Sequence, residues 1–254
     1  MYSHLDSLRV LSLSVDQPEV APGTTVTITP YVSDATGAGR ALTYSASSCP
    51  DPGTSQGVTA SCLGSPLATV IATNLPVTLP TVAHSYTGFV NAFSVTVPAN
   101  ILAGQSSINT YNGVSYLVAY SLTAADGTTT SAFRRIIASQ GHALNTNPSI
   151  TDILSAGVPF TPMPTMVTTL VPSIPSAASE AYTFQDSSGS FVAATESLLM
   201  TWFTNAGDYQ YIRTDLVNPN QFTPGKTAPL TGHNTFVFVL RDRRGGEAVL
   251  QRDF

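Results

Sequence analysis

The stretch "FVFVLRDRRGGEAV", residues 236–249, joins a run of apolar residues to a turn that carries three arginines and two glycines. Such a stretch could contact nucleic acid, bind an anion or form the tip of a β-hairpin. A second stretch, "VAYSLTAADGTTTSAF" at residues 118–133, repeats the apolar strand and the glycine turn without an arginine. Because the strand and the turn recur and the arginines do not, we interpret residues 236–249 as a hairpin. Asp242–Gly246 would make the reversal, with Gly245 and Gly246 free to take positive φ.

The repetition extends over the whole chain. A shift of 118 residues superimposes the two hairpin stretches, and a shift of 142 residues places Ile28 on Leu170. Two units that begin and end alike indicate a tandem duplication, with one domain at 1–143 and a second at 147–254. The polar segment between them, "SQGHALNTNPSI", is short and contains an Asn-Pro step that favours extended backbone. We therefore expect the two units to stack end to end with limited freedom.

Composition and periodicity favour a β protein. Of the 254 residues, 43% are hydrophobic and only 10% are charged, where about 25% charged is usual, which argues against disorder. Residues 25–32 and 93–98 alternate apolar and polar side chains, and residues 114–124 and 235–241 are longer runs typical of buried strands. We predict an all-β fold made of two tandem antiparallel β-sandwiches of the immunoglobulin-like class.

The net charge of −5 disfavours nucleic acid and anionic membranes as partners. No stretch approaches the roughly 18 apolar residues of a membrane span. Arg241, Arg243 and Arg244 belong to the second unit only, and a short turn in an acidic protein is a poor nucleic-acid contact. We expect them to form, at most, a local basic spot that an acidic partner could touch.

Cys49 and Cys62 are the only cysteines, and they flank a turn-rich loop, "PDPGTSQGVTAS". We predict a disulfide between them, which would stabilise the fold by about 3 kcal/mol in the chain-entropy model; two free buried thiols are the alternative. A disulfide implies an oxidising compartment, which means the periplasm, the cell surface or the outside.

Several motifs together resemble known families. The "LRDRRGG" turn resembles the last hairpin of polycystic-kidney-disease-like (PKD-like) domains, and "LLMTWFTNAG" (198–207) places Trp202 where immunoglobulin-like sandwiches bury a Trp. Tyr44 takes the corresponding place in the first unit. Together with the opening segment, "CPDPG" and "NPSI", the chain resembles surface lipoproteins predicted in myxobacteria and related bacteria. The resemblance implies export and a lipid anchor, although no lipidated cysteine is present in a chain that begins at Met1.

Residues that could carry chemistry are scattered. The histidines His4, His84, His142 and His233 lack metal-ligand spacing, and we expect the first, third and fourth of them to be exposed. No Gly-x-Ser-x-Gly elbow or phosphate-binding glycine loop occurs. We predict no catalytic residue, no metal site and no cofactor.

Acidic residues have structural interpretations. Asp34, Asp126 and Asp242 lie in turns, where their side chains can accept hydrogen bonds from nearby backbone amides. Calcium between the two units is an alternative, with ligands from the set Asp16, Glu19 and Asp152.

The segment "NAGDYQYIRTD" (205–215) is the candidate ligand-binding segment. By the period of a strand, Tyr209 and Tyr211 lie on one face and could stack on a sugar beside Arg213. A half-buried strand with its tyrosine hydroxyls at the rim is the alternative.

These observations predict a non-enzymatic, exported protein that acts as a binding or spacer module at the bacterial cell surface, outer membrane or periplasm. Its partner would be a protein or a glycan of the cell envelope. The alternatives are a carbohydrate-binding module, which exposure of Trp202 together with Tyr209 and Tyr211 would favour, or accessory domains of a larger secreted enzyme.

Overall fold

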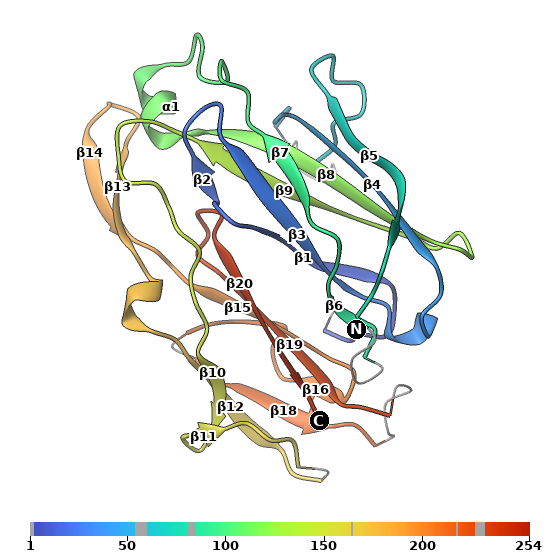
Figure 1. Cartoon of the computed structure of the whole chain (residues 1–254). Helices are drawn as coiled ribbons and strands as arrows, with labels where there is room; N and C mark the ends of the chain where they lie inside the picture. Colours follow the sequence, from blue (N-terminus) through green and yellow to red (C-terminus); the bar gives the residue numbers. More distant parts are fainter. Residues whose placement is uncertain (1–2, 54–59, 81–84, 164, 217, 227–231) are drawn as a thin grey trace.

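The computed structural model describes residues 3–53, 60–80, 85–163, 165–216, 218–226 and 232–254. In these residues the fold is all-β, with strands in several mainly antiparallel sheets, which confirms the predicted class (Figure 1). No helix in the described ranges is long and apolar enough to cross a membrane.

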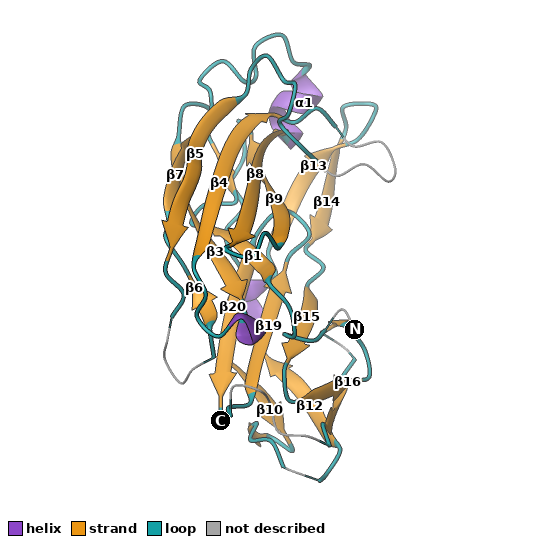
Figure 2. Ribbon diagram, turned by 90° about the vertical axis from the view of Figure 1, so that its right-hand side faces the viewer, coloured by secondary structure: helices purple, strands orange, loops and turns teal. Residues whose placement is uncertain are grey.

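Among the described residues, no sheet combines strands from before residue 145 with strands from after it. We call residues 3–139 the first half and residues 150–254 the second half. The two sheets of the first half face each other (Figure 2). One contains β1 (Arg9–Val15), β3 (Thr25–Ser33), β6 (Thr87–Phe89) and β7 (Phe93–Thr96), and the other contains β2 (Glu19–Val20), β9 (Thr129–Ala138), β8 (Val114–Ala124), β4 (Leu42–Pro50) and β5 (Thr69–Val77).

The second half has two larger sheets and a separate hairpin. The first sheet contains β11 (Val158–Pro159), β10 (Asp152–Ser155), β12 (Thr168–Ser173), β18 (Asn220–Pro224) and β16 (Gly207–Tyr209), and the second contains β17 (Arg213–Asp215), β15 (Leu199–Thr204), β19 (Thr235–Arg241) and β20 (Glu247–Asp253). The hairpin pairs β13 (Ala181–Gln185) with β14 (Phe191–Thr195). Short 3₁₀ turns lie at Ala35–Gly37 and Ser176–Ala178.

Strand alternation accounts for the first core. In β3, Val26 and Ile28 are buried while their neighbours Thr25 and Thr27 are exposed, as a period of two requires. Tyr120 lies across the sandwich from this strand and stacks on Phe93 and Tyr44, with ring centroids 6.0 and 5.4 Å away. The expectation that Tyr44 takes the core place of a sandwich Trp therefore agrees with its position between the sheets.

Trp202 organises the second core, as predicted. It is 0% exposed, its Nε1 donates to Thr214 Oγ1 at 2.9 Å, and its ring meets Phe238 edge-on at 5.4 Å. The indole nitrogen thus keeps a hydrogen bond while the ring leaves water, which is what a buried Trp needs.

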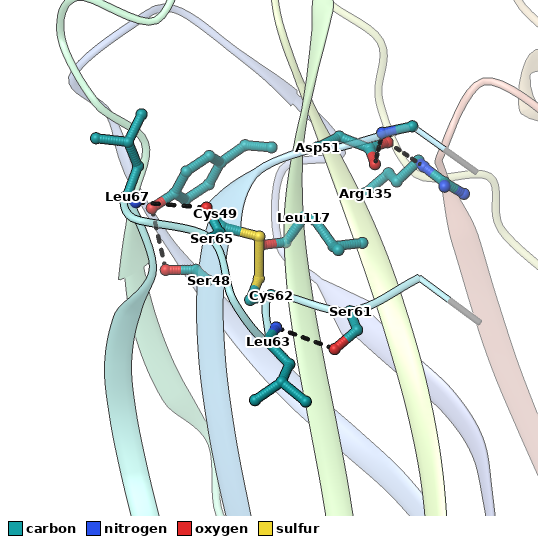
Figure 3. The surroundings of a disulfide bond; sticks show 12 residues. Ser48, Cys49, Asp51, Ser61, Cys62, Leu63, Ser65, Leu67, Leu117 and Arg135 are labelled. Atoms are coloured by element: carbon teal, nitrogen blue, oxygen red, sulfur yellow. Dashed lines mark hydrogen bonds and ion pairs between the residues drawn. A yellow bond between two sulfur atoms is a disulfide. The ribbon is translucent and has the colours of Figure 1, made fainter. Parts of the chain in front are cut away.

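The disulfide between Cys49 and Cys62 is present, with the Cα atoms 5.7 Å apart. It holds Cys62 beside Leu117, and the two cysteines, Leu117 and Ala60 form a small buried cluster on the outer side of β4 and β8 (Figure 3). The bond therefore closes a loop and also shields apolar surface that the sheet would otherwise expose.

The one α-helix in the described residues, α1 (Ser107–Asn112), was not predicted. Residues 99–104 form turns just before it. The start signal for α1 is Ser106, whose hydroxyl accepts from the backbone N of Asn109, and the helix ends at Gly113 with φ +87°.

Trp202→Ala should lower the free energy of unfolding by about 3–5 kcal/mol, because it removes the largest side chain of a closed core. Chemical denaturation followed by circular dichroism would measure the loss. Tyr211→Ala is the matched control, since Tyr211 is 51% exposed and its truncation should change stability by less than about 0.5 kcal/mol. Equal stability of wild type and Trp202→Ala would contradict the assignment.

Candidate functional site

The two halves meet at an interface that we call the junction. Its apolar part is a separate buried cluster in which Leu11 and Tyr31 of the first half meet Phe203, Val237 and Val239 of the second. Each of these side chains is 7% exposed or less, and full burial of such a side chain contributes about 1.5–3 kcal/mol. The junction is therefore a packed core between the halves.

Arg244, at the tip of the β19–β20 hairpin, carries the polar part of the junction. Its Nη1 donates to Glu196 Oε1 at 3.0 Å in the second half, and its Nη2 donates to Glu19 Oε2 at 3.1 Å in the first. The guanidinium also lies 4.1 Å from the ring centroid of Tyr182. One arginine therefore neutralises a buried carboxylate from each half, and its stacking on an aromatic ring fixes its plane.

Glu19 is held by the linker as well as by Arg244. Its side chain is 4% exposed, Oε1 accepts from Ser139 Oγ at 2.6 Å, and Oε2 accepts from the backbone N of Asn145 at 2.8 Å. His142 Nε2 lies 3.3 Å from Oε1. The carboxylate thereby has several donors, as a buried charge requires.

Asp242 shapes the turn that presents Arg244. Its Oδ1 accepts from the backbone N of Arg244 at 2.7 Å and of Gly246 at 2.8 Å, and its Oδ2 accepts from Asn145 Nδ2 at 2.9 Å. This confirms the expected role of Asp242 as a turn residue, and it adds a contact to the linker.

The backbone of the turn differs from the prediction at one position. Gly245 has φ +110°, as expected, but the other residue at positive φ is Arg243, at +65°, and not Gly246. Gly246 is required for a different reason, because a Cβ there would lie 2.8 Å from the carbonyl oxygen of Thr146 and 2.9 Å from Pro148 Cδ. The hairpin therefore packs directly against the linker backbone.

A second set of ion pairs also joins the two halves. In this set the glutamate belongs to the second half and one of its arginines to the first. Glu247 of the second half pairs with Arg134 of the first at 3.3 Å and with Arg241 at 3.2 Å, and it also accepts from Ser12 Oγ. Its backbone N donates to Asn147 Oδ1 at 3.0 Å. Each half thus supplies an arginine to a buried glutamate of the other.

The β13–β14 hairpin, which we call the arm, reaches from the second half to α1 of the first (Figures 1 and 2). Asn112 Nδ2 donates to the Gln185 carbonyl oxygen and Asn112 Oδ1 accepts from the Gln185 N, both at 2.7 Å. Tyr111 and Thr183 hydroxyls lie 2.6 Å apart, and the Tyr111 ring meets Phe191 edge-on at 5.0 Å. The arm is therefore a third tie between the halves.

We call the turn at Asp242–Gly246 the arginine turn. A cleft of about 550 Å³ opens between β9, the arm and the arginine turn, and we call it the junction cleft. That volume lies within the range of small-molecule sites, about 300–1,000 Å³. The lining side chains are mainly basic, aromatic and polar, with one carboxylate and one aliphatic side chain: Glu19, Asn112, Arg135, Ile137, His142, Tyr182, Thr183, Phe184, Arg243 and Arg244.

The residues predicted to bind a ligand do not form one surface. β16 ends at Tyr209, which is 7% exposed and packs on Trp202 and Phe222, whereas Tyr211 follows the strand and is 51% exposed. Arg213 is exposed on β17. The expectation of one shared face was wrong because the strand stops before Tyr211, so the period of two does not continue.

The arginine turn also differs from the expected basic spot. Arg241 and Arg244 are committed to Glu247, Glu19 and Glu196 inside the protein. Burial lowers the pKa of the Arg241 guanidinium, and the neighbouring carboxylate of Glu247 opposes that effect. Among the residues that the structure describes, Arg243 alone of the three has no hydrogen-bond or ion-pair partner. The junction was not predicted from the sequence because its ion pairs join residues that are about 50 to 230 positions apart in the chain.

The histidines and carboxylates have their own partners. His142 was expected to be exposed, but its side chain is only 11% exposed, because it is packed under Tyr111 and against Glu19. His4 pairs with Asp208 at 2.8 Å, His233 is half-buried, and His84 lies outside the described residues. Asp126 accepts from the backbone N of Thr128, as expected, and these bonds lower its pKa.

The remaining predicted carboxylates serve structural contacts. Asp34 forms two 2.8 Å bonds with Arg40 rather than with backbone amides. Of the calcium alternatives, Asp16 accepts from the backbone N of Thr27 and Asp152 pairs with Arg252. In the described part of the chain, no three His, Cys, Asp or Glu side chains gather as a metal site would need.

No protein-family model and no curated protein matches the sequence. Among solved structures, the chain is similar to the sporulation control protein Spo0M from Bacillus subtilis, with a TM-score of 0.28 and 12% identity over 98% of this chain and 90% of that one. It is also similar to dimeric latent PorU from Porphyromonas gingivalis, with a TM-score of 0.23 and 10% identity over 98% of this chain and 24% of that one.

Glu196 gives the junction a pH dependence. Its side chain is 1% exposed, and burial raises its pKa even though Arg244 lies beside it. A raised pKa in the folded state means that the folded protein holds the proton more tightly than the unfolded chain. Glu196 therefore contributes stability at acidic pH that is lost as the pH rises through its folded pKa.

Glu196→Gln keeps the shape and the acceptor oxygen but cannot titrate. The wild type should be most stable relative to this variant at pH values below the ordinary pKa of a glutamate, and the difference should shift against the wild type as the pH rises toward neutrality. Urea denaturation of both proteins across that range measures the difference. A difference that does not change with pH would contradict the assignment.

Proposed function

We propose that this protein is a non-enzymatic, exported module of the bacterial cell envelope that binds or spaces other envelope components. It would consist of two tandem immunoglobulin-like sandwiches held as one rigid body. The observation that carries the proposal is the junction, where a packed apolar cluster, reciprocal ion pairs and the arm connect the halves. Flexible tandem domains do not need such an interface, whereas a spacer of fixed length does.

Recurring strand pairings support the tandem arrangement. The antiparallel pair β1–β3 in the first half corresponds to β10–β12 in the second, and the hairpin β8–β9 corresponds to β19–β20. Strands β4 and β15 pair with β8 and β19 in the same way. The shift of 142 residues aligns β1 and β3 with β10 and β12, and the shift of 118 residues aligns β8 and β9 with β19 and β20, whereas β4 and β15 correspond by their pairing alone. Duplication remains our interpretation, with domains at 1–143 and 147–254.

The disulfide supports export. Cys49 and Cys62 are bonded inside a small apolar cluster with Ala60 and Leu117, and such structural disulfides persist in oxidising compartments. The cell surface, the outer membrane and the periplasm all meet that condition. The resemblance to surface lipoproteins supports the same compartments and a lipid anchor, and the envelope partner would be a protein or a glycan.

Small-angle X-ray scattering tests the rigid arrangement. The wild type should scatter as a single particle of fixed shape, with a profile that does not change between low and high salt. Arg244→Met should broaden the distance distribution and lower stability by about 3–5 kcal/mol, because it leaves Glu19 and Glu196 buried without their partner.

Arg243→Gly is the matched control, since it removes the same charge from the same turn but touches no ion pair. Its scattering should match the wild type. A wild-type profile of two bodies that move independently would contradict the proposal.

A further inference from the structure

We infer that the junction cleft is a binding site for an acidic saccharide, with Arg243 and Arg135 binding its carboxylate and Phe184 packing against its ring. This inference deepens the binding role proposed above and rests on it, whereas the rigidity measured by scattering does not depend on any ligand. The carboxylate would come from a uronic-acid residue of an envelope glycan.

The walls of the cleft come from elements that the junction holds in place. Arg135 and Ile137 lie on the outer face of β9, and Tyr182 and Phe184 lie on one face of β13, with their ring centroids 6.3 Å apart. Arg243, Arg244 and Gly245 of the turn also line the cleft. Because the arm is clamped to α1, the distance between the two walls is fixed before any ligand arrives, which reduces the entropy lost on binding.

One arginine without an ion-pair partner in the described part of the chain, Arg243, points to an anion as the ligand of the cleft. Three arginines line it against one glutamate, in a protein whose net charge is −5. Arg244 is neutralised on both sides, so it serves to position Tyr182 and the turn. Arg243 has no ion-pair or hydrogen-bond partner among the described residues. Arg135 forms an ion pair with Asp51 through Nε at 2.5 Å, so its charge is compensated, but its two terminal nitrogens have no hydrogen-bond partner among the described residues and can still donate to a ligand.

The backbone holds Arg243 at the cleft at some cost. Arg243 has φ +65°, which is uncommon for a residue other than glycine. A glycine at position 243 would adopt this conformation without strain. The turn nevertheless places an arginine there, while Gly245 and Gly246 occupy the positions that need conformational freedom or close approach. Arg243 therefore lines the cleft at a backbone position that favours glycine, and no described contact within the fold uses its side chain.

The aromatic wall favours a sugar over an acidic peptide. Phe184 is half-buried and lines the cleft beside Tyr182, whose ring is already covered by Arg244. A pyranose ring presents apolar C–H groups that pack on such a ring while its carboxylate reaches the arginines, which can grip it with paired hydrogen bonds. A chain of aspartates or glutamates would satisfy the arginines but leave the aromatic wall without a partner.

Isothermal titration calorimetry with trigalacturonic acid as the probe tests this site. The full chain should bind the probe, with an affinity that falls as salt rises, and should not bind neutral maltotriose. Arg243→Gly, which suits the left-handed backbone, and Phe184→Leu, which keeps apolar volume, should each weaken binding by about tenfold, since a hydrogen bond to a charged group or a buried ring contact is of that order. Arg213→Ala is the matched control, because it removes an exposed arginine outside the cleft.

Melting temperatures of the variants separate lost binding from lost folding. Absence of binding in the folded wild type would overturn the inference, and so would equal losses in Arg243→Gly and Arg213→Ala. Equal affinity for hexaglutamate would also overturn it, in favour of an acidic peptide. Binding of maltotriose with the same affinity would show that the arginines do not select the ligand.

Discussion

The structure depends on one arginine that two buried carboxylates share. Arg244 Nη1 and Nη2 lie 3.0 and 3.1 Å from oxygens of Glu196 and Glu19, which belong to different halves. Burying a single charge in a protein interior is costly, and the pair stays buried only when both partners are present. The two halves must therefore meet in one orientation for either carboxylate to be satisfied.

Buried ion pairs are weak evidence for net stability, because the loss of hydration offsets much of the Coulombic attraction. The driving force at the junction comes from its apolar cluster, where Leu11, Tyr31 and Val237 leave water. The ion pairs instead determine how the two halves are oriented relative to each other. A packing that is slightly rotated would keep most of the apolar contact, but it would leave Glu19, Glu196 or Glu247 unpaired. From this division of roles we expect the two halves to move as one body, with the junction cleft held between them.

Much of the fold is local in the sequence, and this part was predictable. Alternation gave strands such as β3 and β7, apolar runs gave β8 and β19 with their observed bounds, and a turn-rich loop between Cys49 and Cys62 indicated a disulfide. The burial of Trp202 was expected from the resemblance to immunoglobulin-like sandwiches, which bury a Trp at this place. The prediction that Tyr209 and Tyr211 share one face was wrong because β16 ends at Tyr209. The helix α1 was missed because it has six residues and no buried face, so that its caps, Ser106 and Gly113, are its main sequence signals.

The junction could not be read from the sequence. The arginines of the hairpin looked like a surface patch because their charge is visible locally, whereas their partners Glu19 and Glu196 lie 225 and 48 residues away. Residues that are so far apart in the chain follow no periodicity or motif spacing from which an ion pair between them could be predicted. The repeated hairpin without arginines was the useful clue, since it showed that the charges serve something specific to the second half.

Differential scanning calorimetry of the intact chain is the most direct test that the two halves form one cooperative body. The shared apolar cluster and the reciprocal ion pairs mean that neither half can unfold without exposing buried charge on the other. We therefore predict one transition, with equal calorimetric and van't Hoff enthalpies. Two separate transitions, or a calorimetric enthalpy about twice the van't Hoff value, would show that the halves unfold independently and would contradict the account.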